Sequence, residues 1–97
     1  MSPGDLINFV RTIDGEDLNT LARGETFTVH ALYNGIEYTP ISTNKPRKQQ
    51  YGGLALVCGE FSRTNSFKTA DFKHLTANAS YALAVIDRYL HSHDSTT

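Results

Sequence analysis

The chain has 97 residues, of which 39% are hydrophobic and 20% charged, and its formal net charge is −1. This length fits one domain, and the composition is that of a folded globular protein, which argues against a disordered chain and against a multidomain protein. No apolar run approaches the ~20 residues of a membrane span, and no secretory signal is visible, so we expect a cytoplasmic protein.

Cysteine and histidine usage argues against a metal centre. Cys58 is the only cysteine, which rules out an intrachain disulfide and a cysteine-based zinc site. It lies in the apolar run 54–58 and is expected to be a small buried side chain. No metal-ligand spacing relates the four histidines, which are His30, His74, His91 and His93. We therefore predict neither a metal site nor a cofactor.

Charge is distributed unevenly along the sequence. Residues 1–44 contain two arginines against six carboxylates, whereas residues 45–74 contain six lysines and arginines against two carboxylates. This separation of acidic and basic segments is the most informative feature of the composition, and the net charge of −1 does not reveal it. It directs the search for a binding surface to residues 45–74.

The first predicted element is a helix that begins after Ser2 and ends at Gly15. Ser2 is a suitable N-cap, Pro3 suits the first helical position, and Asp5 favours the positive helix start. Hydrophobic residues then recur at helical spacing, namely Leu6, Phe9 or Val10, and Ile13. A second, short helical turn is expected over residues 17–22, before Arg23-Gly24.

Residues 26–41 predict a β-hairpin. Hydrophobic residues alternate with polar ones up to Asn34-Gly35, a pair typical of two-residue turns with positive φ. Such a turn pairs Tyr33 with Ile36, Ala31 with Tyr38, and Val29 with Pro40. These six side chains and Phe27 then share one face, which we expect to be buried.

The opposite face of this hairpin is mixed in character. It carries Thr28, His30, Leu32, Glu37, Thr39 and Ile41. Two strands alone are marginally stable and leave both edges unpaired. We therefore expect a homodimer with Leu32 and Ile41 at its interface, since a two-fold contact needs only one self-complementary patch. The alternative is that the N-terminal helix folds over this face within one chain.

The second half of the chain predicts two helices joined by loops. Residues 42–50 and 62–75 are polar and are expected to be loops, the latter with a short helical turn near 71–75. Residues 51–61 fit a helical stripe better than a short buried strand over 54–58, despite three glycines. The apolar spacing predicts an amphipathic helix over 77–92, and residues 94–97 are expected to be disordered. The result is one α+β domain over 1–97, an antiparallel hairpin or small sheet packed against N-terminal and C-terminal helices.

Two polar, basic segments are the candidate functional site. Cations neutralise phosphate charge, and hydroxyls and amides donate hydrogen bonds to phosphate oxygens. If the loops 42–50 and 63–68 meet in space, they form one positive surface with Tyr51 or Phe67 available for stacking. The predicted contacts to nucleic acid or another polyanion are Asn44, Lys45, Arg47, Lys48, Gln49, Arg63, Asn65 and Lys68.

No catalytic arrangement stands out in the sequence. Gly52-Gly53 lacks the lysine and serine of a phosphate-binding loop, and nothing marks a nucleophile elbow. We therefore predict a small non-enzymatic binding module, with nucleic acid or another polyanion as its partner. Two alternatives remain open. One is a protein–protein interaction module or homodimeric accessory subunit, and the other is a small-ligand pocket lined by Tyr33, Tyr38, Tyr51, Tyr81 and Tyr89.

Overall fold

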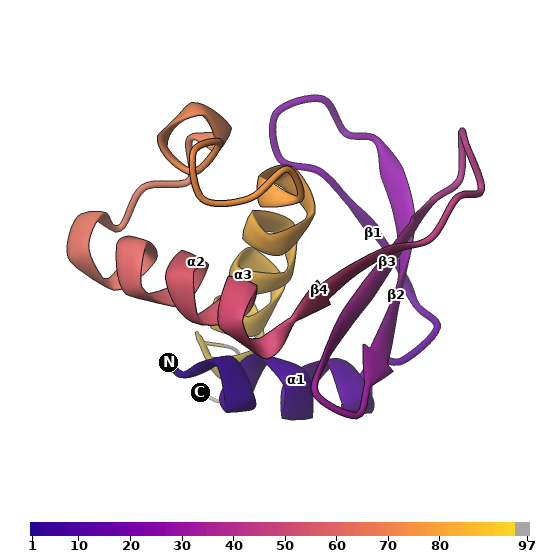
Figure 1. Cartoon of the computed structure of the whole chain (residues 1–97). Coiled ribbons are helices and arrows are strands. Elements are labelled where there is room, and N and C mark those ends of the chain that lie inside the picture. The colour runs from indigo at the N-terminus through magenta and orange to yellow at the C-terminus, as the bar shows by residue number, and fades with distance from the viewer. Residues whose placement is uncertain (95–97) are drawn as a thin grey trace.

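The computed structural model describes residues 1–94 and confirms the α+β fold (Figure 1). Helices pack against one face of a four-stranded antiparallel sheet with strand order β1-β2-β3-β4. The elements are α1 (Pro3–Thr12), β1 (Asp17–Asn19), β2 (Thr26–Leu32), β3 (Gly35–Pro40), β4 (Arg47–Gln50), α2 (Tyr51–Thr64), the 3-10 helix η1 (Thr69–Asp71) and α3 (Ala79–Asp94). Asp94, expected in a disordered tail, is the last residue of α3, and the rest of that prediction, 95–97, lies outside the described residues.

Helix α1 begins where the sequence predicts. Asp5 N–H donates to Ser2 Oγ at 3.1 Å, and Ser2 N–H donates to the Asp5 carboxylate at 2.9 Å, which is a reciprocal capping box. Leu6, Ile7 and Val10 are buried in the core that the sheet also lines. The helix therefore packs on the core side of the sheet. The alternative that this helix covers the opposite face is wrong.

Two strands lie where the sequence predicted none. Residues 17–19, predicted as a helical turn, form β1, and residues 47–50, predicted as part of a loop, form β4. Each strand buries a single residue, Leu18 in β1 and Gln49 in β4, so neither carries a hydrophobic alternation. Because these strands flank the central hairpin, β2 and β3 are paired along both edges, and the expected unpaired edges of the hairpin do not exist.

The hairpin register also differs from the predicted one. Leu32 pairs with Gly35, and Val29 pairs with Tyr38, so the turn is Tyr33-Asn34 and neither turn residue has positive φ. A Cβ atom on Gly35 would lie 2.4 Å from the carbonyl oxygen of Gln49, so glycine is needed there for close approach to β4 rather than for the turn.

The displaced register keeps most of the predicted core face. Shifting the pairing by two residues leaves the same side chains on the same side of the sheet. Phe27, Val29, Ile36 and Tyr38 are fully buried as expected, whereas Tyr33 leaves the strand and is 97% exposed.

Helices α2 and α3 complete the core. Residues 51–64 are helical, as favoured over the short strand, and bury Leu54, Val57, Cys58 and Phe61. Helix α3 begins two positions later than predicted and buries Ile86 fully within its inward stripe. A helical turn was expected near 71–75, and the short helix observed there is η1, which covers Thr69–Asp71 and overlaps the expected range only at Asp71. Among residues 1–94, no helix combines the length and apolar character that a bilayer crossing needs.

Aromatic rings join the sheet to α3, and two successive hydrogen bonds join it to the loop just before α3. Tyr38 stacks on Tyr81 with ring centres 5.5 Å apart, and Phe27 meets the Tyr81 ring edge-on at 5.0 Å. The Tyr38 hydroxyl donates to Gln49 Oε1 at 2.7 Å, and Gln49 Nε2 donates to Thr76 Oγ1 at 3.1 Å. Burial raises the pKa of Tyr38 well above its ordinary value, so its hydroxyl remains a donor.

Candidate functional site

The strongest cluster of predicted site residues lies on the β3–β4 hairpin, here called the basic hairpin and comprising residues 42–48. Every residue of this segment is exposed, and its tip extends from the end of the sheet, away from α2 (Figure 1). Asn44 has a φ of 55°, and its N–H donates to the Pro40 carbonyl at 2.7 Å, which closes the tip. Within residues 1–94, Lys45, Arg47 and Lys48 take part in no ion pair, so their charges are available to a ligand.

Arg47 is held in place by an aromatic platform. The alternation of β4 places it on the helix side of the sheet, where its guanidinium carbon lies 5.8 Å from the centre of the Tyr81 ring. Tyr81 is itself fixed by stacking on Tyr38. A cation over an aromatic face is stabilised by the ring quadrupole, so Arg47 presents its charge at a defined place beside the hairpin.

Gln49 has a different role from the one predicted. It is only 4% exposed, and its side-chain amide accepts a hydrogen bond from Tyr38 and donates one to Thr76. Its neighbour Lys48 points to the other face of the sheet, opposite Glu37 in the strand register. Gln49 therefore belongs to the core and is not accessible to a ligand, which the polar sequence 47–50 gave no means of detecting.

The second predicted segment, residues 63–68, lies at the far end of α2 from the basic hairpin (Figure 1). Arg63 donates two hydrogen bonds to the Glu60 carboxylate, at 2.6 and 3.2 Å, and these lower the pKa of Glu60 and raise that of Arg63. Asn65 ends α2 with a φ of 54°. Lys68 precedes η1 and is exposed. The structure thus does not bring the two basic loops together into one surface.

A pocket of about 300 Å³, here called the basic pocket, lies where three segments meet. The β1–β2 loop supplies Arg23, the stretch after η1 supplies Lys73, and the first turn of α3 supplies Ser80. The full lining is Thr20, Ala22, Arg23, Glu25, Thr69, Ala70, Lys73 and Ser80. Sequence reasoning missed this pocket because its residues come from segments far apart in the chain and share no local motif.

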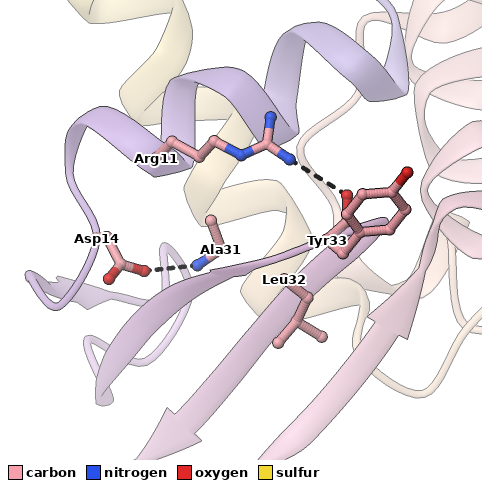
Figure 2. Close-up of a pocket in the computed structure, with 5 residues that line it drawn as sticks. All are labelled: Arg11, Asp14, Ala31, Leu32 and Tyr33. Atoms are coloured by element: carbon pink, nitrogen blue, oxygen red, sulfur yellow. Dashed lines mark hydrogen bonds between the residues drawn. The ribbon is translucent and has the colours of Figure 1, made fainter.

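A shallower pocket of about 370 Å³ lies between α1 and the end of β2 (Figure 2). Arg11 Nη2 donates to the Tyr33 carbonyl at 3.2 Å, and Asp14 Oδ1 accepts from the Ala31 N–H at 2.7 Å. His30 Nδ1 lies 3.6 Å from the same carboxylate oxygen. These polar groups anchor α1 to the sheet. The side chain of Tyr33 is almost fully exposed to solvent.

The predicted interface residues lie at opposite ends of the open sheet face. Leu32 ends β2 and is half-buried, whereas Ile41 follows β3, is 57% exposed, and donates its N–H to the carbonyl of Thr26 at the start of β2. The length of β2 separates them by roughly 20 Å at about 3.3 Å per residue. Within residues 1–94, no helix covers the face between them.

The tyrosines are dispersed. Tyr38 and Tyr81 stack in the core, Tyr33 and Tyr51 are exposed, and Tyr89 packs edge-on against Phe9. Among the described side chains, no group of three or more His, Cys, Asp or Glu residues is arranged to hold a metal ion. Comparison of the chain with protein-family models, with curated proteins and with solved structures finds no match.

Proposed function

We propose that this domain is a non-enzymatic binding module that contacts the nucleic-acid backbone through the basic hairpin. One observation carries the proposal: Arg47 is positioned over Tyr81 on an exposed hairpin that also carries Lys45 and, on the opposite face of β4, Lys48, and these cations have no ion-pair partner in residues 1–94. The sequence contains no carboxylate between Glu37 and Glu60. A projecting segment with three cations and no anion attracts negatively charged groups such as phosphates.

The contacts we propose are to phosphates rather than to bases. Tyr81 is only 8% exposed, so its ring supports Arg47 and is not itself free to stack on a base. The remaining side chains at the tip are short hydroxyls and an amide, Ser42, Thr43 and Asn44, which suit phosphate oxygens. Binding should therefore depend strongly on salt and weakly on nucleotide sequence.

Residues 63–68 are left out of the proposed site. Arg63 is paired with Glu60 in the last turn of the 14-residue helix α2, about 20 Å from the start of that helix, and Lys68 precedes η1 outside the basic hairpin. Lys68 therefore serves as a control cation of the same charge that is also exposed.

Fluorescence anisotropy with a labelled oligonucleotide tests the proposal. Wild-type protein should bind at about 50 mM salt, with affinity that falls steeply as salt rises. Changing Lys45, Arg47 and Lys48 together to Ala should reduce the slope of log affinity against log salt by roughly one per cation. Lys68→Ala should leave the slope unchanged. Absence of binding at about 50 mM salt, or equal effects of the triple variant and Lys68→Ala, would overturn the proposal.

We also propose that two copies associate through the open sheet face. The supporting observation is that Ile41 and Leu32 expose apolar surface on a face that no helix covers within residues 1–94. A two-fold dimer would carry two basic hairpins, and linked sites raise the apparent affinity for a long polyanion without any new contact. The compartment we propose is the reducing cytoplasm, where a buried free thiol such as Cys58 is expected.

A further inference from the structure

The basic pocket combines two unpaired cations with three hydroxyl groups. Within residues 1–94, neither Arg23 nor Lys73 takes part in an ion pair or a side-chain hydrogen bond. Thr20 is buried, and its Oγ1 accepts from the Glu25 N–H at 3.0 Å, which fixes the β1–β2 loop against the pocket. Thr69 and Ser80 are half-buried in its wall. The lining is thus rich in donors for a negatively charged group.

One carboxylate, that of Glu25, also lines the pocket, so two cations face one anion. This balance suits a ligand that carries a compact negative charge together with hydroxyl groups. The negative group would face Arg23 and Lys73, and a ligand hydroxyl would donate to Glu25. The volume of about 300 Å³ is at the lower end for small-molecule sites and is larger than a bare inorganic ion requires.

We propose that the basic pocket binds a phosphomonoester attached to a sugar. A monoester carries a charge of about −1.5 to −2 at neutral pH and three acceptor oxygens, which matches two cations and three hydroxyls better than a singly charged diester does. The sugar hydroxyls supply the donors that Glu25 accepts. This inference stands independently of the proposed backbone binding, because it rests on residues outside the basic hairpin.

The position of the pocket gives this chemistry two possible sources. Ser80 lines the pocket, and the next residue, Tyr81, carries Arg47 over its ring, so the pocket wall and the aromatic support of Arg47 adjoin in the first turn of α3. A phosphorylated strand end could therefore enter the pocket while its backbone lies on the hairpin. A free sugar phosphate of the same chemistry could occupy the pocket alone.

Titration with a nucleoside 5′-monophosphate, followed by amide chemical shifts, tests the inference. Shifts should centre on residues 20–25, 69–73 and 80, and the unphosphorylated nucleoside should produce none. Changing Arg23 and Lys73 together to Ala should weaken binding at least tenfold, the value of one charge-assisted hydrogen bond, whereas Arg63→Ala, in the last turn of α2, should have no effect. Because both pocket cations are exposed, the double variant should fold, and an unchanged pattern of remote amide shifts checks this. No pocket shifts, or shifts that the double variant leaves unchanged, would overturn the inference.

Oligonucleotides with and without a terminal phosphate then distinguish the two sources. Tighter binding of the phosphorylated end, lost in the Arg23 and Lys73 double variant, identifies a strand end. Equal binding of both ends, with the monophosphate still bound, identifies a free sugar phosphate. If no oligonucleotide binds, the proposed backbone binding fails, and the monophosphate titration still decides the fate of the pocket.

Discussion

The hydroxyl of Tyr38 lies 2.7 Å from Oε1 of Gln49, and this buried hydrogen bond joins β3 to the edge strand β4. The amide nitrogen of Gln49 continues the chain to Thr76, three residues before α3 begins. A strand of four residues, three of them exposed, thereby gains a fixed place in the core. The root of the basic hairpin depends on this bond, because Arg47 belongs to the same strand.

Changing Gln49 to Leu should lower the free energy of unfolding by about 1–3 kcal/mol, because the buried Tyr38 hydroxyl loses its acceptor. Tyr38→Phe alone should be destabilising for the converse reason. The double variant removes both polar groups and should be less destabilised than the sum of the single variants. Denaturant unfolding measures all three, and strict additivity would mean that the bond contributes no coupling.

Changing Ile86 to Ala should cost about 2–5 kcal/mol of stability, because this fully buried side chain of α3 leaves a cavity in a packed core. The matched control is Leu56→Ala on α2, where the side chain is 53% exposed. Its effect should stay within about 0.5 kcal/mol. Similar losses for the two variants in urea unfolding would contradict the placement of α3.

Changing Gly35 to Ala should destabilise the domain strongly, because its Cβ would meet the Gln49 carbonyl at 2.4 Å and force β3 and β4 apart. Gly59→Ala is the control. Nothing lies within 4 Å of a Cβ at that helical position, so alanine should stabilise by about 0.5–1 kcal/mol. Thermal unfolding of both variants gives the comparison, and an unfolding temperature of Gly35→Ala at or above wild type would disprove the close approach.

Stability should fall as the pH rises from 9 towards 11, because burial raises the pKa of the Cys58 thiol from 9.0 to about 11. The unfolded chain releases this proton first, so deprotonation favours unfolding across that interval, and the full contribution is present below pH 9. Cys58→Val should show a weaker decline over the same range. Urea midpoints measured at several pH values decide the matter, and identical profiles for the two proteins would refute the assignment.

Light scattering across a dilution series should show a mass near twice 10.8 kDa at high concentration if the open sheet face self-associates. Leu32→Glu and Ile41→Glu should each shift the protein towards the monomer, since each buries a charge in the proposed contact. Thr39 lies on the same face, and Thr39→Ser is a conservative control. A mass of 10.8 kDa at every concentration would exclude the dimer, and a dimer that tolerates both glutamates must use another surface.

The sequence was sufficient for the elements with strong local signals. The N-cap residue Ser2, with Pro3 and Asp5 after it, located α1, and the spacing of hydrophobic residues located α2 and α3. The strands β1 and β4 were missed because their pairing, rather than any periodicity of their own, makes them extended. The turn was misplaced because Asn34-Gly35 favours positive φ, while contact of Gly35 with β4 decides the register.

The candidate site was predictable only in part. Charge clustering located Lys45, Arg47 and Lys48, since a cluster of lysine and arginine residues is visible in the sequence itself. Nothing local distinguished Gln49, whose amide is buried, from Gln50, which is exposed. Two further features depend on the tertiary fold. Residues 63–68 lie away from the basic hairpin, and Arg23 and Lys73 line one pocket. No short sequence pattern indicates either arrangement.

The meander topology has a consequence for how the protein folds. Each strand pairs with its neighbour in the chain, so the sheet closes only short loops and should form early, whereas α3 must return from the other end of the chain to reach it. The pair between Glu16 and Arg88 spans 72 positions at 2.9 Å and can form only at that last step. During synthesis, the apolar face of the sheet therefore stays partly exposed until α3 has been made. Premature termination before residue 79 should yield an aggregation-prone fragment.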